Sequence, residues 1–341
     1  MNTLDIQALR LHLPNTARPV LDGVDLTVAA RETVALVGES GSGKTLTSRS
    51  VLRLLPAGAR AEGAVRVAGQ DVLTMTADEL RTLRTRTAAM VFQDPRAAIN
   101  PLRRLGDFLT ESLLLSAGAS PEQAERRAGE LLAAVGLGER VLRQYPGELS
   151  GGMLQRVMIA AALMGGPRLI LADEPTTALD VTTQAEVVSL LGELRERFGT
   201  GLLFVTHDLG LAAAISDRVY VMYAGRIAET GPAGALFERP RHPYTAALLA
   251  STPRLDAPRG RLAAIEGRPP GLREAVTGCP FAPRCPLASS LCAEQAPELM
   301  PLAFEPEHLT ACHHSDRLGD RPDGAGSRQT SDRLDEENTR A

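Results

Sequence analysis

Short apolar runs recur along the first 235 residues, separated by segments with a helical pattern. Three of these runs, residues 33–37, 169–172 and 202–205, are rich in β-branched and other apolar residues, and polar or glycine-rich residues follow each one. Runs of this length without alternation are typical of strands buried on both faces of a parallel sheet. Open α/β sheets bind their ligands beyond the carboxyl ends of such strands. The pattern therefore predicts an α/β core with a ligand site at one edge of its sheet.

The segment from residue 106 to residue 164 has a different pattern, helix-rich and almost free of strand signals. Ser120, Pro121 and Gln123 predict a helix start, with an N-cap, a proline at the first helical position and a capping box. Gly136 predicts where that helix ends. We interpret residues 98–164, with approximate bounds, as a helical subdomain inserted into the α/β core.

Proline becomes frequent after residue 232, which indicates a boundary. We expect residues 1–235 to form the main domain and residues 236–315 to form a loop-rich C-terminal extension. Residues 316–341 are rich in glycine, serine and charged side chains with little to bury, so a disordered tail is expected there. No internal repeat is visible, so the chain is expected to carry one copy of the core.

Composition narrows the functions that are possible. The longest apolar runs, such as residues 157–164, are far shorter than the roughly 20 residues that a membrane-spanning helix needs. The N-terminus lacks a basic segment followed by an apolar one, so no secretory signal and a cytosolic location are expected. The net charge of −4 gives no overall basic field, so nucleic acid is not an expected partner.

Residues 38–45, GESGSGKT, match the phosphate-loop pattern GxxxxGK[ST] between a predicted strand and a predicted helix. Glycines let successive backbone N–H groups point inward, and the following helix adds its positive end. Lys44 is predicted to reach the β and γ phosphates, and the Thr45 hydroxyl is predicted to bind Mg²⁺. A plain glycine-rich turn before a helix is the alternative. The candidate nucleotide-binding residues are Gly38, Ser40, Gly41, Ser42, Gly43, Lys44 and Thr45.

Two adjacent carboxylates, Asp173 and Glu174, follow the apolar run at residues 169–172. Carboxylates this close to a core are costly unless they have a function. Asp173 is placed to hold Mg²⁺, directly or through water. Neighbouring residues that leave a strand point in different directions, so Glu174 can face the attacking water as the catalytic base. A solvated loop is the alternative, and the phosphate loop favours the functional interpretation.

Residues 149–156, LSGGMLQR, closely resemble the signature of the ATP-binding cassette (ABC) family. Ser150 can cap the following helix, and two glycines let its N-terminus approach a phosphate closely. Further matches follow in the expected order: Gln93 in VFQDP, Asp180 in ALD and His207 in THD. Each alone also fits a turn or a structural side chain. The resemblance implies a P-loop NTPase with a RecA-like α/β core, an antiparallel β part and an inserted helical subdomain.

The same resemblance implies roles for these residues. Gln93 would be a ligand of Mg²⁺ and water, and His207 would contact the γ-phosphate and position the water, which makes Glu174, His207 and Gln93 the catalytic set. The residues that would act in trans, on ATP bound to a second cassette, are Ser150, Gly151, Gly152 and Asp180. ATP and Mg²⁺ are the implied cofactors. The aromatic residue that stacks on adenine in this family is not evident near residues 11–14, so stacking is either weak or supplied by His12.

Several segments resemble the dipeptide/oligopeptide importer branch of the family, over residues 3–314. They are residues 90–95 and 99–102, residues 173–181, and HPYT at 242–245 with RPP at 268–270 in the C-terminal extension. The branch implies a peripheral ATPase at the cytoplasmic face of the membrane that drives uptake of dipeptides and oligopeptides. It implies a heterodimer with a paralogous ATPase, two permease subunits and an extracytoplasmic peptide-binding protein. An importer ATPase for another solute, such as nickel or glutathione, and a non-transport ABC scaffold are the alternatives.

All four cysteines lie in the C-terminal extension, and a cytosolic location argues against disulfides. Their spacing matches neither CxxC zinc sites nor ferredoxins, so zinc, an iron–sulfur cluster and free thiols all remain open. Three nearby histidines, His308, His313 and His314, keep zinc possible. The resemblance of residues 278–280 and 284–286 to the importer extension implies a structural [4Fe-4S] cluster. Its ligands would be Cys279, Cys285, Cys292 and Cys312.

Overall fold

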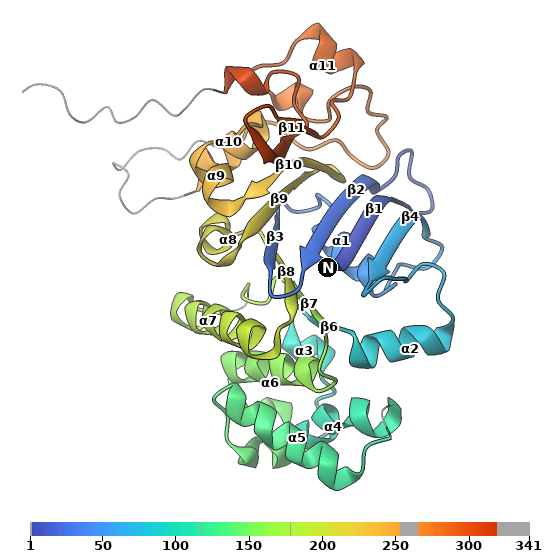
Figure 1. Ribbon diagram of the computed structural model, residues 1–341, viewed down its shortest axis with the longest axis vertical. Coiled ribbons are helices and arrows are strands. Elements are labelled where there is room, and N and C mark those ends of the chain that lie inside the picture. Colours follow the sequence, from blue (N-terminus) through green and yellow to red (C-terminus); the bar gives the residue numbers. More distant parts are fainter. Residues whose placement is uncertain (1, 117, 178, 253–264, 319–341) are drawn as a thin grey trace, which may run out of the picture.

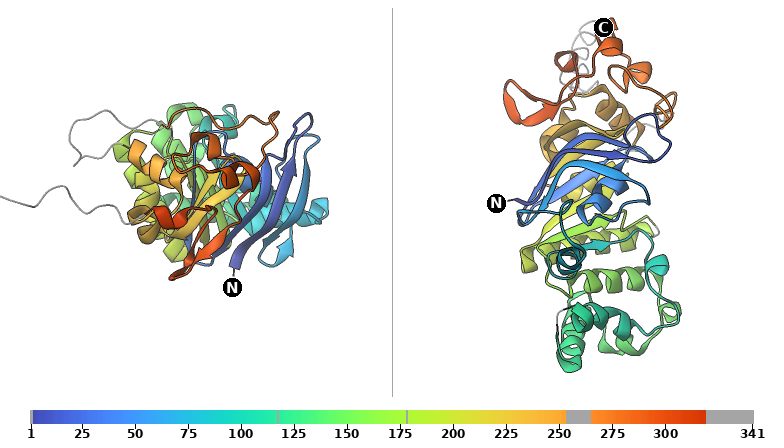
Figure 2. Two further views of the ribbon diagram at one scale, coloured as in Figure 1. Left: turned by 90° about the horizontal axis from the view of Figure 1, so that it is seen from above. Right: turned by 90° about the vertical axis from the view of Figure 1, so that its right-hand side faces the viewer.

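The computed structural model describes residues 2–116, 118–177, 179–252 and 265–318 of the chain. Figure 1 shows three parts stacked along the long axis: a helical part at one end, two sheets in the middle and a loop-rich C-terminal part at the other end. The side view of Figure 2 shows the same order. Residues 319–341, most of the predicted disordered tail, lie outside the described residues, and Ser315–Arg317 form a short 3₁₀ turn, η4.

The larger sheet has eight strands in the order β11-β12-β10-β9-β3-β8-β7-β6. Strands β6, β7, β8, β3 and β9 pair with one another in parallel, whereas β9 and β10 are antiparallel. Every residue of β3, β7 and β8 is buried. This confirms the prediction of buried parallel strands. The bounds are β3 (Thr33–Val37), β6 (Ala88–Val91), β7 (Leu169–Asp173), β8 (Gly201–Thr206), β9 (Arg218–Tyr223), β10 (Arg226–Pro232), β11 (Met300–Leu302) and β12 (Glu305–Thr310).

The smaller sheet is antiparallel, with the order β2-β1-β4-β5. Helix α1 (Lys44–Val51) packs between the sheets, and its Val51 shares one apolar core with Ile6 of the smaller sheet and Leu36 of the larger sheet. The expected antiparallel β part is therefore present. The bounds are β1 (Asn2–His12), β2 (Leu21–Ala29), β4 (Arg60–Val67) and β5 (Gln70–Asp71).

Helices make up the lower end of Figure 1. The predicted capping box is present, because Ser120 accepts from the backbone N–H of Gln123 and the Gln123 side chain bonds the Ser120 backbone. Gly136 follows the end of α5, as predicted, and has a left-handed conformation with φ of 76°. The bounds are α2 (Ala77–Arg86), α3 (Pro95–Ala98), α4 (Leu105–Ser116), α5 (Pro121–Ala134), η1 (Glu139–Arg143), η2 (Pro146–Glu148) and α6 (Gly151–Leu163).

The C-terminal extension is attached to the core by sheet pairing. Strand β12 pairs with β10, and the buried His308 of β12 contacts the buried Glu229 of β10 at 2.7 Å. The extension therefore shares the larger sheet with the main domain. The remaining helices are α7 (Val181–Phe198), α8 (Leu209–Ile215), α9 (Ala233–Glu238), α10 (Pro243–Ser251), η3 (Ala282–Arg284) and α11 (Ser290–Glu294).

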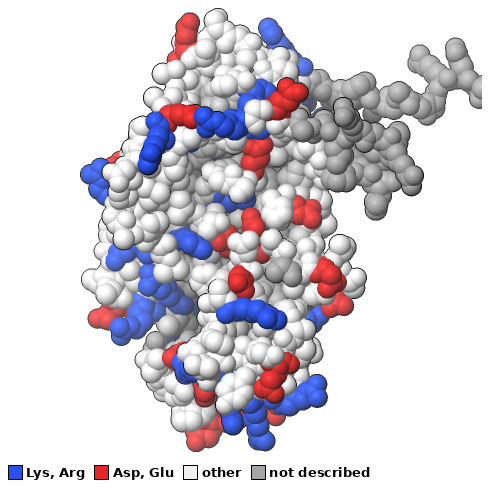
Figure 3. Space-filling model, turned by 180° about the vertical axis from the view of Figure 1, so that it is seen from behind, with Lys and Arg blue, Asp and Glu red and all other residues white. Residues whose placement is uncertain are grey.

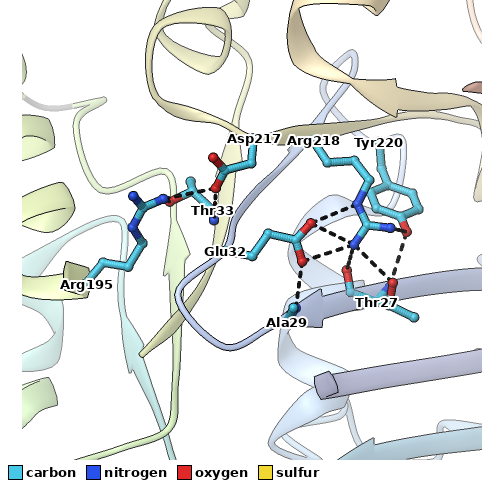
Figure 4. A network of polar contacts seen from close by, with 8 residues as sticks. All are labelled: Thr27, Ala29, Glu32, Thr33, Arg195, Asp217, Arg218 and Tyr220. Carbon is cyan, nitrogen blue, oxygen red and sulfur yellow. Dashed lines mark hydrogen bonds and ion pairs between the residues drawn. The ribbon is translucent and has the colours of Figure 1, made fainter. Parts of the chain in front are cut away.

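Polar contacts fix the two sheets relative to each other (Figure 4). Arg218 of β9 forms an ion pair with Glu32 at 2.9 Å and donates to the backbone oxygen of Thr27 in β2 at 3.0 Å. The carboxylate of Asp217 accepts from the first residue of β3, Thr33, at 2.7 Å. These contacts hold β2 and β3 in place at the two ends of the loop that joins them.

On the face seen in Figure 3, basic and acidic side chains are interspersed.

Candidate functional site

The turn between β3 and α1 has a backbone that only glycine fits at two points. Gly38 has φ of 151°, and a Cβ there would lie 2.2 Å from the carbonyl oxygen of Met222. Gly43 has φ of 113°, and a Cβ there would lie 2.7 Å from Leu21. The loop is therefore held against β9 and β2 so closely that side chains at these points are excluded. The result is a tight loop that leads into the N-terminus of α1.

The polar groups of this loop suit an anionic ligand. Lys44 is buried, and its Nζ donates to the carbonyl oxygens of Gly38 at 2.8 Å and Glu39 at 3.0 Å. Burial lowers the pKa of Lys44, and the nearby carboxylates, Glu174 first, oppose that shift. The Ser42 hydroxyl is buried without a hydrogen-bond partner among the described residues. An unpaired donor and a buried cation in a glycine turn at a helix start fit a phosphate chain.

Asp173 and Thr45 come together beside the loop. The Thr45 hydroxyl donates to Asp173 Oδ1 at 3.0 Å, although the two residues are far apart in sequence. Asp173 is only 3% exposed, and burial raises the pKa of its carboxyl, while the Thr45 hydrogen bond and the charge of Arg49 lower it. A hydroxyl and a carboxylate in contact are the hard oxygen ligands that Mg²⁺ takes at nucleotide sites. The predicted metal ligands Thr45 and Asp173 therefore fit Mg²⁺.

Three side chains contact one carboxylate oxygen, Glu174 Oε2. Gln93 Nε2 donates to it at 3.2 Å, the Thr177 hydroxyl donates at 3.1 Å, and His207 Nδ1 lies at 3.5 Å. These residues follow the carboxyl ends of β6, β7 and β8, which are neighbours in the sheet. Glu174 has φ of 48°, an uncommon value for a residue with a side chain that often marks functional sites. The structure thus brings Gln93, Glu174 and His207 together, and it adds Thr177, which the sequence interpretation missed.

The remaining predicted residues form a second group. Ser150, Gly151, Gly152 and Asp180 line an open pocket, and no phosphate-loop residue lines it. Ser150 caps α6 by accepting from the backbone of Met153 at 3.3 Å. Asp180 caps α7 by accepting from Thr183 at 3.0 Å, and these hydrogen bonds lower the pKa of its carboxyl. The pocket therefore lies at two capped helix starts, and the phosphate loop of the same chain does not contribute to its lining.

The loop between β1 and β2, where an adenine-stacking residue was sought, is attached to the C-terminal extension. Arg18 donates to the backbone oxygens of Pro270 at 2.9 Å and Gly271 at 3.3 Å, and Ala17 donates to Leu272 at 3.0 Å. No aromatic residue occurs between Leu13 and Val20. The contact joins residues more than 250 positions apart, and no local sequence signal indicates it.

The four cysteines line one small cavity in the extension, together with His242, His313 and His314. Burial raises the pKa of Cys312 to about 11 and also raises the pKa values of Cys279 and Cys285. Backbone N–H groups donate to Cys285 and Cys312, each at 3.4 Å. Among the described residues, however, no three His, Cys, Asp or Glu side chains are arranged to hold a metal ion. The predicted ligand set converges, but a metal site is not seen.

One zinc candidate was wrong. His308 does not line the cysteine cavity: its Nε2 contacts Glu229 at 2.7 Å and its Nδ1 contacts Glu305 at 3.2 Å. Both ring nitrogens therefore have partners, and the Nε2 contact attaches β12 to the core. Its closeness in sequence to Cys312 was misleading, because His308 lies within β12 whereas Cys312 follows the end of that strand at Thr310.

The fold and the phosphate loop together define a nucleotide-binding cassette. Residues 21–177 match the ABC transporter family, and the dimeric ATP-binding cassette MJ0796, solved with ADP and phosphate, is similar with a TM-score of 0.60 and 30% identity over 67% of this chain and 98% of that one. The cassette cbiO1 from Clostridium perfringens shares the fold, with a TM-score of 0.61, 23% identity and coverage of 69% and 90%. No helix of the described ranges is long and apolar enough to span a bilayer.

The C-terminal extension indicates the branch of the family to which the chain belongs. Residues 228–292 match the C-terminal region of oligopeptide/dipeptide transporters. The oligopeptide transport ATP-binding protein OppD of Salmonella typhimurium is 44% identical over 313 residues, 91% of this chain and 92% of that protein. AppD of Bacillus subtilis is 43% identical over 286 residues, 83% and 87% of the two chains. The chain therefore belongs to the oligopeptide/dipeptide branch of the ABC transporter ATP-binding proteins.

Proposed function

We propose that this chain is the ATPase subunit of a peptide importer, which hydrolyses ATP to ADP and phosphate and couples that reaction to uptake of dipeptides or oligopeptides. The contact between Thr45 and Asp173 carries this proposal, because it joins the phosphate loop to the strand end that bears Glu174. The names of the relatives support the peptide as the transported solute.

Each predicted residue has a role in this proposal. The phosphates would be held by the loop residues Gly38, Ser40, Gly41, Ser42, Gly43 and Lys44. Thr45, Asp173 and Gln93 would hold Mg²⁺, which when bound neutralises charge on the phosphates. The Glu174 carboxylate takes the proton of the attacking water, whose oxygen bonds to the γ-phosphorus as the bond to the β-phosphate oxygen breaks. His207, at 3.5 Å from Glu174, positions that water.

The second group of residues is proposed to act on another subunit. Ser150, Gly151, Gly152 and Asp180 line a pocket without a phosphate-loop residue, so a nucleotide there needs its phosphate loop from elsewhere. We propose that a paralogous ATPase supplies it in a heterodimer. The domain division at residue 235, with a helical subdomain over residues 98–164, belongs to the same proposal.

The membrane partners are proposed to be two permease subunits, with an extracytoplasmic peptide-binding protein that delivers the solute. The chain would then be a peripheral protein at the cytoplasmic face. The segment between Gln93 and Leu102 is the proposed permease contact. Leu102, a large apolar side chain, is 85% exposed there, which favours a contact that covers it.

A [4Fe-4S] cluster in the extension is part of the proposal, with a structural role. The four cysteines that line one cavity supply the thiol donor set, and the backbone N–H groups that donate to Cys285 and Cys312 are of the kind that tunes such clusters. Iron, sulfide and zinc analysis of anaerobically purified protein tests this, and stoichiometric zinc without iron would contradict it.

The proposed reaction is tested with Glu174→Gln in the assembled transporter. The amide cannot take a proton from water, so steady-state phosphate release is expected to fall by about 100-fold or more while ATP binding is kept. Normal phosphate release would remove Glu174 from the role of base. Stimulation of the wild-type ATPase by peptides, compared with nickel or glutathione presented with their binding proteins, tests the solute.

A further inference from the structure

The C-terminal extension reaches the phosphate loop through one ion pair. The Arg284 guanidinium contacts the Glu39 carboxylate with both ends: Nη1 lies 2.8 Å from Oε2, and Nη2 lies 2.9 Å from Oε1. The Arg284 side chain is only 5% exposed. A paired, buried contact of this geometry is among the stronger polar interactions in proteins and fixes direction as well as distance.

Arg284 is itself held firmly within the extension. Its Nε donates to the backbone oxygen of Glu266 at 2.9 Å, and Nη2 donates to that of Ile265 at 3.2 Å. Its guanidinium also lies over the rings of Tyr223 and Phe281, in each case with 5.8 Å between Cζ and the ring centroid. The extension, together with Tyr223 of β9, therefore sets where this side chain points.

Glu39 is held by the extension at its backbone as well. Its N–H donates to the hydroxyl of Tyr244, a fully buried residue of α10, at 2.8 Å. Its carbonyl oxygen accepts from Lys44 at 3.0 Å. The backbone of Glu39, which helps to orient the phosphate-binding Lys44, is thus hydrogen-bonded to a residue of the extension.

The same short turn carries Arg284 and two of the cysteines. Backbone hydrogen bonds link Ala282 to Cys279 at 3.0 Å, Arg284 to Phe281 at 2.9 Å and Cys285 to Ala282 at 3.2 Å. Cys279 and Cys285 line the cysteine cavity, and Arg284 directly precedes Cys285. A rearrangement of these thiols would therefore move the side chain that contacts the phosphate loop.

We propose that Arg284 is a positioning residue for the phosphate loop, through which the cysteine-bearing extension sets the affinity of the ATP site. The ion pair holds Glu39, and Glu39 and Gly38 hold Lys44 in place for the phosphates. This inference rests on the proposed function in one respect, that ATP binds at this loop. It differs from a purely structural anchor, which would hold the extension on the core without any effect on nucleotide affinity.

The test measures the ATP dissociation constant of the full-length chain by equilibrium binding, together with its thermal unfolding temperature. Arg284→Gln is expected to weaken ATP binding about tenfold, a typical size for coupling between sites. Arg284→Lys keeps the charge but not the two-ended contact, so an intermediate loss is expected. Glu39→Gln leaves the extension intact and is expected to act like Arg284→Gln. The double variant should be no weaker than either single one, because the residues act as a pair.

Arg239→Gln is the matched control. Arg239 forms an ion pair within the extension, with Glu305 of β12 at 2.9 Å, and no hydrogen bond or ion pair joins it to a described residue of the phosphate loop. Its loss is expected to leave ATP affinity unchanged. The proposal is overturned if Arg284→Lys and Glu39→Gln, both folded, bind ATP within twofold of the wild type. Failure of the wild-type chain to bind ATP would instead refute the proposed function.

Hydrogen exchange gives a second, independent measurement. Coupling between two sites is reciprocal, so ATP should slow amide exchange in residues 279–285 of the wild-type protein. In Arg284→Gln, at ATP concentrations that saturate the variant, this protection should be largely lost. Equal protection in both proteins would contradict transmission through Arg284.

Discussion

The phosphate-loop group and the signature pocket differ in how their residues are held. In the first, Lys44 and Asp173 are buried, and side chains from the ends of neighbouring parallel strands contact one another. In the second, Ser150 and Asp180 are exposed and bond to the first turns of their own helices. Parallel strand ends assemble a site within one chain, whereas helix starts leave backbone N–H groups free for an outside anion. The comparison predicts that the first group binds ATP alone and the second acts only in an assembly.

The largest effect is expected from Lys44→Ala. This removes the only lysine of the chain, a buried cation at the centre of the loop. Loss of a buried partner of this kind costs several kcal/mol, so ATP affinity is expected to fall about 100-fold in the isolated chain, and turnover in the assembled transporter should be lost. Equilibrium binding and phosphate release measure the two effects. Unchanged affinity would show that the loop is not the phosphate site.

Gly151→Ala tests the signature pocket. The new Cβ would meet nothing in its own chain closer than 3.9 Å, at Leu179, so folding and ATP binding by the isolated chain should not change. In the assembled transporter the methyl group would crowd a phosphate at the start of α6, and turnover is expected to fall about tenfold.

Gly192→Ala is the control for that variant, since a Cβ there meets no atom within 4 Å in the middle of α7. It should leave both assays unchanged and raise stability by about 1 kcal/mol. If Gly151→Ala weakens ATP binding by the isolated chain, the division into two separate groups is wrong.

The phosphate-loop group was largely predictable from sequence because each of its residues lies in a short motif. Lys44, Asp173 and Glu174 follow strands whose apolar runs reveal their positions, so the sheet brings them together. Thr177 was missed because a lone threonine after a carboxylate gives no distinctive signal. The contact of Glu39 with Arg284 could not be predicted, since it depends on docking between segments 245 positions apart.

The C-terminal extension was the less predictable part of the fold. Strand β12, with the sequence EPEHLT, has no apolar run, and half of its residues are exposed or carry charge. It pairs with β10 across a buried Glu229, which accepts from His308 as well as from the backbone of Arg241 at 2.6 Å and of His242 at 3.1 Å. A hydrophobic pattern predicts that a carboxylate such as Glu229 lies at the surface, because the pattern does not show the hydrogen-bond donors that make its burial possible.

A moderate effect is expected from Thr177→Val, which removes one of the three contacts to Glu174 Oε2 without altering the shape of the side chain. A single hydrogen bond to a charged group is worth about 1.5 kcal/mol, so the rate constant of turnover should fall about tenfold while ATP affinity stays constant. Thr177→Ser keeps the hydroxyl and should restore most of the rate. If the serine variant is as slow as the valine variant, the loss of the Thr177 hydroxyl is not the cause of the lower rate.

The smallest effect concerns the charge of Lys44 itself. Burial lowers its pKa from the ordinary 10.5, so the neutral amine that reacts with acylating reagents should appear at lower pH than in an exposed lysine. Because Lys44 is the only lysine, mass spectrometry of the peptide that contains it reports its modification separately from the N-terminal amine. The rate should rise with pH to a midpoint below 10.5, and ATP should slow it by covering the amine. A midpoint at or above 10.5 would mean that the carboxylates of Asp173 and Glu174 outweigh burial, and that this half of the site is more open to water than its geometry indicates.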